Sequence, residues 1–152
     1  MKVRSPFADG MRAFEQGHLD EAQSHFTEAA LDPAFAPAAL SKRGVCKVLA
    51  GDRAGARNDF EAALARDPRC AAALVNLGNL AQESGETDEA RVRYEAAIKA
   101  DANYAPAHHN LGVLYRVTGR IDESVRELRL AASLDARPKA LMERFKGLFR
   151  RR

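Results

Sequence analysis

Two asparagines, Asn76 and Asn110, stand at the head of nearly the same pentapeptide, NLGNL and NLGVL. An asparagine side chain carries two N–H donors and one carbonyl acceptor, so a single amide can hydrogen-bond both polar atoms of a peptide backbone. Two such amides at a fixed interval would hold an extended chain whatever its side chains are. The other interpretation is that asparagine is merely tolerated on an exposed helix surface, and the residue type alone leaves both open.

The remaining residues that could do chemistry are histidines and cysteines. His108 and His109 are adjacent and would point about 100° apart on a helix, so they are not expected to share a metal ion. Cys46 and Cys70 lack the close spacing of zinc or redox motifs and are expected to be buried thiols in a reducing compartment. No GxSxG, phosphate-binding loop or HExxH motif is present. The sequence therefore predicts no catalytic residue, no metal site and no cofactor.

The composition is that of a globular protein. Of the 152 residues, 46% are hydrophobic and 30% are charged, and no apolar run approaches the roughly 18 residues of a membrane-spanning helix. The first ten residues contain two basic side chains but no apolar stretch of the kind that forms a secretory signal. We therefore expect a cytoplasmic protein, and the abundance of Ala and Arg suggests a bacterial source.

Glycine recurs every 34 residues along the chain, which indicates an internal repeat. Two glycine ladders share this step: Gly10, Gly44, Gly78 and Gly112, and Gly17, Gly51, Gly85 and Gly119. Three further ladders keep the same register: Ala22, Ala56, Ala90 and Ser124; Phe26, Phe60, Tyr94 and Leu128; and Ala29, Ala63, Ala97 and Ala131. The chain thus contains four units, residues 3–36, 37–70, 71–104 and 105–138, which we number one to four.

Each unit has the pattern of two helices joined by a short turn. Apolar residues recur at three- and four-residue spacing on both sides of the second glycine ladder. Gly85 and its equivalents stand where the first helix should end, a place that favours a positive φ. Acidic pairs such as Asp88 and Glu89 then open the second helix, where they complement its exposed amides and its dipole. Asp67 and Pro68 are expected to end unit two, because proline does not continue a helix.

This pattern resembles the tetratricopeptide repeat family, whose pattern of tryptophan, leucine, glycine, tyrosine, alanine, phenylalanine and proline is met in part in two units. The matching residues are Leu77, Gly78, Ala90, Tyr94 and Ala97, and Gly44, Ala56, Phe60, Ala63 and Pro68. The resemblance implies an all-α fold, a right-handed α-solenoid of antiparallel helix pairs. It also implies that the first helices line a concave groove.

The sequence departs from the family pattern at several packing positions. The tryptophan position holds Pro6, Leu40, Leu74 and His108, and Arg43 replaces the usual leucine before Gly44. Alanines replace the closing proline of units three and four. We expect these departures to weaken individual units, the first above all, without disturbing the register.

The end of the chain is basic and amphipathic. Residues 137–152 carry seven Lys or Arg against one Glu, a net charge of +6, which leaves −3 for the rest of the chain. In the register of a fifth unit, Met142, Phe145 and Phe149 occupy packing positions of a first helix. Residues 139–152 are therefore expected to form a separate capping helix over the apolar end of the solenoid. Binding of this helix to an anionic membrane surface is the alternative.

The groove predicted from the resemblance has an apolar half and a polar half. The apolar half comes from units one and two and consists of Phe7, Met11, Phe14, Val45 and Val48, with Lys42 beside them. Phe35, or the residues before Phe7, could instead cover this stripe. The polar half comes from units three and four and consists of Asn76, Asn79, Gln82, Asn110, His109 and Arg116. A clamp for a terminal carboxylate, known in some relatives, is not supported, because Ser41 and Val75 stand where it needs other polar groups.

The sequence therefore predicts a non-enzymatic scaffold or adaptor that binds a segment of another protein in this groove. Self-assembly through the apolar half and peripheral membrane attachment through the basic helix are the alternatives. Nucleic acid is not expected as a partner, since the basic run lacks interleaved aromatic residues and the rest of the chain is acidic.

Overall fold

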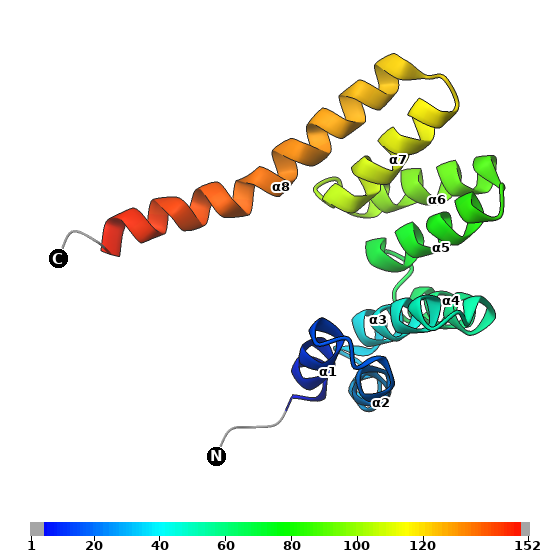
Figure 1. Ribbon diagram of the computed structural model, residues 1–152, viewed down its shortest axis with the longest axis vertical. Helices are drawn as coiled ribbons and strands as arrows, with labels where there is room; N and C mark the ends of the chain where they lie inside the picture. The colour runs from blue at the N-terminus through cyan, green and yellow to red at the C-terminus, as the bar shows by residue number, and fades with distance from the viewer. Residues whose placement is uncertain (1–4, 150–152) are drawn as a thin grey trace.

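The chain is an array of antiparallel helix pairs (Figure 1). The computed structural model describes the backbone of residues 5–149 and the side chains of residues 5–135. Within this range there are eight helices and no strand: α1 (Pro6–Glu15), α2 (Leu19–Ala29), α3 (Ala36–Leu49), α4 (Arg53–Arg66), α5 (Ala71–Glu83), α6 (Thr87–Ala100), α7 (Ala105–Val117) and α8 (Ile121–Phe149). The expected all-α array of helix pairs is confirmed.

The turn inside each unit is made by the glycines of the second ladder. All four have a positive φ, for example 77° at Gly85, which follows the end of α5. Acidic residues then open α2, α6 and α8, as the sequence predicts. In unit two, Asp52 caps α4 instead, since its side chain accepts a hydrogen bond of 2.8 Å from the backbone N–H of Gly55.

The first glycine ladder lets the two helices of a unit approach each other. A Cβ atom on Gly78 would lie 2.5 Å from Cε1 of Tyr94, so the tyrosine ring fills the space that a side chain would need. Tyr94, Phe60 and Phe26 are fully buried at equivalent positions in three units. The core is therefore a row of similar packing sites, one for each unit.

Aspartates end the second helix in units two and three. Asp67 and Asp101 leave the helix with φ values of −143° and −145°. Their carboxylates accept hydrogen bonds from the backbone N–H of Arg69 at 2.9 Å and of Asn103 at 3.0 Å. The expected turn at Asp67 and Pro68 is confirmed.

Arg43, which stands where the family usually has leucine, has charged and polar partners in units one and two. Arg43 donates from Nε and Nη2 to the two carboxylate oxygens of Asp59, at 2.9 and 2.7 Å, and from Nη1 to Oγ1 of Thr27 at 3.0 Å. Lys47 places its Nζ 3.0 Å from the same carboxylate, whose side chain is only 5% exposed. A bidentate, hydrogen-bonded ion pair thus replaces the apolar contact that the family makes here.

His108 is compensated in a similar way. Its Nδ1 lies 2.6 Å from Oε2 of Glu127 and its Nε2 lies 2.8 Å from the carbonyl oxygen of Ala102. The ring is 4% exposed. This histidine is a packed, hydrogen-bonded residue between α7 and α8.

The structure differs from the prediction at the start of the expected capping helix. The sequence placed a boundary between residues 138 and 139, whereas α8 is one helix of 29 residues. Asp135 stands in the register of Asp67 and Asp101, yet the helix continues past it. The residues on either side of Pro138 are helix formers, and in this structure they outweigh the proline, which by itself disfavours a helix.

The contacts expected for Met142, Phe145 and Phe149 lie outside the described side chains. About 15 residues of α8 run beside α7, and the remaining 14 continue for about 20 Å past the start of that helix. Figure 1 shows this second half of α8 projecting from the array.

Candidate functional site

The first helices lie on the inside of the curve. α3 contacts α5 and α5 contacts α7, and these contacts are more extensive than those between second helices of neighbouring units. An array in which one layer of helices is drawn together curves toward that layer. The structure thus supports the concave position that the resemblance implies for the first helices.

A hollow of about 90 Å³ opens between α3 and α5, at the junction of units two and three. Its lining residues are Val45, Val48 and Leu49 of α3, Phe60 of α4, and Asn76, Asn79, Leu80 and Glu83 of α5. The volume is below the roughly 150 Å³ of a cavity that holds benzene, and far below an ordinary small-molecule site. The hollow is therefore suited to one aliphatic side chain.

Asn76 lies beside this hollow with its amide uncommitted. Its side chain is half-buried and makes no hydrogen bond to any of the residues whose side chains the structure describes. Val45 and Val48 are also half-buried, whereas Leu49 is 61% exposed. The arrangement offers an apolar contact and an amide next to each other.

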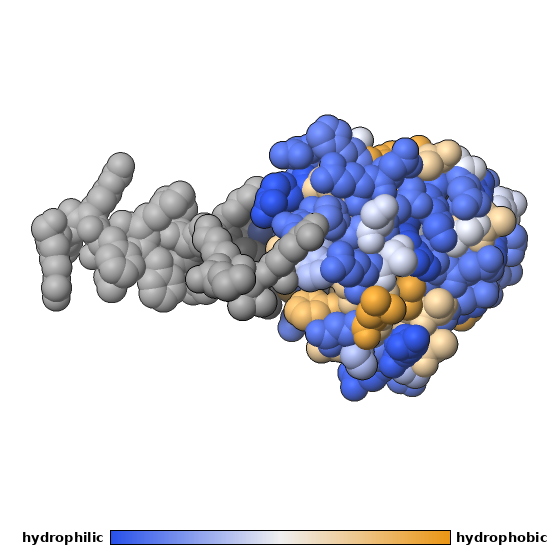
Figure 2. All heavy atoms as spheres, turned by 90° about the horizontal axis from the view of Figure 1, so that it is seen from below, coloured by the Kyte–Doolittle hydropathy of each residue, from blue (hydrophilic) through white to orange (hydrophobic). Residues whose placement is uncertain are grey.

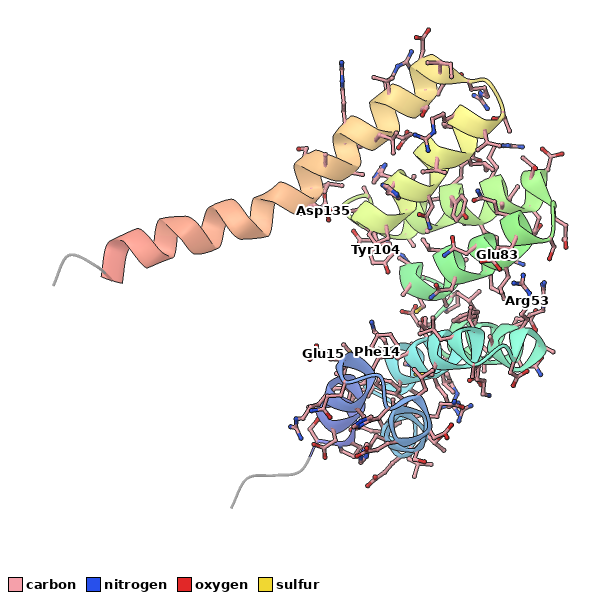
Figure 3. All side chains as sticks on the ribbon, viewed as in Figure 1. Phe14, Glu15, Arg53, Glu83, Tyr104 and Asp135 are labelled. Carbon is pink, nitrogen blue, oxygen red and sulfur yellow. The ribbon has the colours of Figure 1, made fainter. Side chains whose placement is uncertain are left out.

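An ion pair borders the hollow. Arg53 at the start of α4 pairs with Glu83 at the end of α5, and its Nη2 also lies 3.4 Å from the carbonyl oxygen of Leu80. Figure 3 shows the two side chains pointing toward one another from their separate helices. This pair joins neighbouring units, and sequence reasoning missed it. The repeat gave no signal for it, because the positions equivalent to Arg53 hold Leu19, Thr87 and Ile121.

The polar half of the groove is arranged differently. Nδ2 of Asn110 donates to Oδ1 of Asn79 at 2.7 Å. The hydroxyl of Tyr94 lies 2.8 Å from the same oxygen and 2.9 Å from Oε1 of Gln82. A hydroxyl has one proton, so it donates to one of these oxygens at a time. One N–H of the Asn110 amide is therefore already bonded to Asn79, and the contact of Asn110 with a partner stays a prediction.

Tyr94 is the group that organises this network. Burial, followed by the negative charge of Glu83, raises the pKa of Tyr94 to about 12. The hydroxyl therefore keeps its proton at neutral pH and remains a hydrogen-bond donor. The sequence showed that the ring packs against Gly78, but not that its hydroxyl reaches the concave face.

Three other predicted groove residues lie apart from the hollow. His109 and Arg116 are exposed on α7, and the structure does not bring them to Asn76. Lys42 belongs to unit two, one unit before that of Asn76, and its Nζ lies 5.9 Å from the centre of the Phe14 ring. This distance is within the range of a cation–π contact.

The apolar stripe of unit one is mostly used in packing. The ring of Phe7 lies 5.7 Å from that of Phe26 and 5.7 Å from that of Phe35, on which it stacks. Met11 and Phe14 are partly buried against the core cluster of this unit. Phe35 thus covers part of the stripe, which was one of the two interpretations of the sequence, and Val45 and Val48 are the apolar residues that reach the hollow.

The part of the chain that the structure describes contains neither a candidate metal site nor a candidate membrane-spanning helix. No three His, Cys, Asp or Glu side chains there are grouped so as to hold a metal ion. No helix there is both long enough and apolar enough to cross a membrane.

A family model described as tetratricopeptide repeat matches residues 47–102 and 81–144. Among curated proteins, no relative matches this chain. Solved structures do. MamA is 20% identical over 89% of this chain and 79% of its own, with a TM-score of 0.68. A thermophilic repeat protein of Thermus thermophilus is 24% identical over 86% of this chain and 73% of its own, also with a TM-score of 0.68.

A third solved structure contains a bound peptide. It is the first repeat domain of Spaghetti (RPAP3) bound to the HSP90 peptide SRMEEVD. It is 21% identical over 78% of this chain and 98% of its own, with a TM-score of 0.64. At these identities the three likenesses show the fold.

Proposed function

Because this chain belongs to the tetratricopeptide repeat family, we propose that it is a protein-binding scaffold that holds a partner segment at the junction of units two and three. One aliphatic side chain of the segment enters the hollow between α3 and α5. The amide of Asn76 bonds the backbone of the segment beside it. The scaffold contributes binding and no chemistry of its own.

The observation that carries this proposal is the free amide of Asn76 next to an apolar hollow. A ligand would give the half-buried amide a hydrogen-bond partner. It would also bury the apolar surface of the valines that line the hollow. The repeat domain of Spaghetti supports a peptide as the kind of ligand, because it holds one on the same fold. The amides at the next junction are bonded to each other and are secondary in this proposal.

A library of displayed peptides, selected on the wild-type protein, tests the proposal without a known partner. We expect the selected peptides to share an aliphatic residue at one position. Val48→Glu puts a charge into the hollow and should abolish their binding. Val92→Glu makes the same change on α6 at a position that is 50% exposed, and should leave binding unchanged.

Two results would overturn the proposal. One is a selection that yields no shared aliphatic position. The other is a set of peptides that bind Val48→Glu as tightly as they bind the wild type, which would place the binding surface elsewhere.

A further inference from the structure

A second hollow lies at the N-terminal end of the array, away from the groove. It has a volume of about 590 Å³ and is formed by α1, the end of α2 and the turn that leads to α3. Its lining residues are Ser5, Pro6, Phe7, Glu28, Ala29, Leu31, Asp32 and Phe35. The proposed function does not use this surface.

The hollow exposes large apolar side chains. Leu31 is 82% exposed and Phe35 is 43% exposed. Figure 2 looks onto this end of the molecule and shows apolar side chains gathered in a patch among hydrophilic ones. Apolar groups that are gathered around a hollow and bordered by charge mark an interaction surface more often than scattered ones do.

The charged side chains that line this hollow are both acidic. Glu28 and Asp32 are exposed there, and among the residues whose side chains the structure describes no basic one belongs to the lining. A ligand that fits this surface would therefore combine an apolar face with positive charge.

The same chain contains a segment of that chemistry in the second half of α8. In the sequence of residues 139–149, Leu141, Phe145 and Leu148 recur at four- and three-residue spacing, which places them on one face of a helix. Arg144 borders this face and supplies positive charge beside it, whereas Lys139 and Lys146 belong to the opposite side of the helix. Residues 137–152 carry a net charge of +6, and the charged residues that line the hollow, Glu28 and Asp32, are acidic, so the two surfaces have complementary charge.

The position of this segment makes it available to another molecule. The helix extends about 20 Å beyond the start of α7 and points away from the array (Figure 1). The hollow lies at the opposite end, in unit one. While α8 remains a straight helix, a second copy of the chain can receive it.

We propose that the second half of α8 of one copy docks into the N-terminal hollow of the next copy. Leu141, Phe145 and Leu148 contact Phe7, Leu31 and Phe35, and Arg144 at the border of this apolar face meets Glu28 and Asp32. Such a contact joins two different surfaces, so it is heterologous and leaves a free hollow and a free helix at the ends of each assembly. A single helix face in a hollow is a small interface, which belongs to the weak class of protein contacts.

Light scattering on the full chain over about a hundredfold range of concentration measures this association. We expect the average mass to rise with concentration beyond that of a dimer. Leu31→Glu places a charge at a position that the fold does not need, and should raise the dissociation constant by roughly tenfold or more. Val92→Glu is the matched control and should associate like the wild type. Raised salt should have a smaller effect, because exposed ion pairs are weak and screened.

Mixing two variants tests the head-to-tail arrangement directly. Leu31→Glu has a damaged hollow and an intact helix, whereas Phe145→Glu has the reverse. Each should be monomeric alone, and the mixture should form a one-to-one dimer that does not grow further. A wild-type protein that stays monomeric at every concentration would overturn the proposal. So would assemblies that Leu31→Glu leaves unchanged, or a mixture that does not associate.

Discussion

The junction of units two and three and the junction of units three and four use the same sequence element, yet only the first is open. Asn76 and Asn110 occupy equivalent positions in NLGNL and NLGVL. Asn76 lies free beside a hollow, whereas Asn110 donates to Asn79. The residues around them cause this difference. At the open junction the neighbours from unit two are Val45 and Val48, and at the closed junction the equivalent neighbours from unit three are Asn79 and Gln82.

A single hydroxyl group adds to the contrast. Phe60 is fully buried below the open junction, and Tyr94 holds the equivalent place below the closed one. The ring packing is the same, but the tyrosine hydroxyl ties Asn79 and Gln82 together. A repeat protein can thus keep an aromatic ring at one core position in neighbouring units for stability. The presence or absence of the ring's hydroxyl group then changes which part of the groove is open to a ligand.

Removing the Tyr94 side chain should have the largest effect on the closed junction. Tyr94→Ala leaves a cavity against Gly78 and is expected to lower the free energy of unfolding by about 3–5 kcal/mol. Tyr94→Phe keeps the ring and loses only the hydrogen bonds, so it should lower the free energy by about 1 kcal/mol. Urea denaturation of both variants measures the difference. Equal losses would mean that the hydroxyl, and not the ring, dominates the site.

A variant of Asp59 tests the buried ion pair of unit two, the unit that supplies the apolar side of the open junction. Burial by itself raises the pKa of Asp59, but the hydrogen bonds and charges of Arg43 and Lys47 outweigh it, so the pKa is lowered. Breaking a buried ion pair is strongly destabilising, and Asp59→Asn should lower the free energy of unfolding by about 3 kcal/mol at neutral pH. Urea denaturation at pH 7 measures this loss.

The pH dependence of that loss has a definite sign. With a lowered pKa in the folded state, the stabilisation by Asp59 is complete above its unfolded pKa of about 3.9, and it is lost as the pH falls through the folded value. The wild type should therefore approach the stability of Asp59→Asn only below about pH 4. A difference between the two proteins that stays constant down to the acid limit would contradict this ion pair.

Phe60→Tyr should make the open junction more like the closed one. By its register the added hydroxyl would lie against Val45 and Val48, where the Tyr94 hydroxyl meets Asn79 and Gln82, and it would take up part of the hollow. We expect a change of about 1 kcal/mol or less in the free energy of unfolding, since the ring is retained. Binding of the peptides selected on the wild type should fall. Unchanged binding would show that the hollow does not receive a side chain.

The fold followed from the sequence because its signals repeat. Glycines such as Gly78 and Gly85 recur once in every unit and specify a close helix contact and a positive φ, two local requirements that a sequence shows directly. The end of the array has no such signal, and α8 passes Asp135 without the turn that Asp101 makes. Helix continuity there depends on the balance between one proline and its helix-forming neighbours.

The site was predicted less completely. The stripe predicted from the register and the family resemblance contains Asn76, Val45 and Val48, which line the hollow between α3 and α5. The bonding of Asn110 and the pairing of Arg53 with Glu83 were not predicted, because both join side chains of different units. Their distances depend on how each unit is rotated against the next, and the period of the repeat does not contain that information.

A titration of a selected peptide against Asn76→Ala and Asn110→Ala tests the contrast between the junctions most directly. Asn76→Ala should weaken peptide binding by roughly fivefold or more, the value of one hydrogen bond, and leave the urea midpoint unchanged. Asn110→Ala should lower the urea midpoint and change peptide binding little. The reverse pattern, with Asn110 needed for binding and Asn76 for stability, would contradict the assignment of the open junction as the binding site.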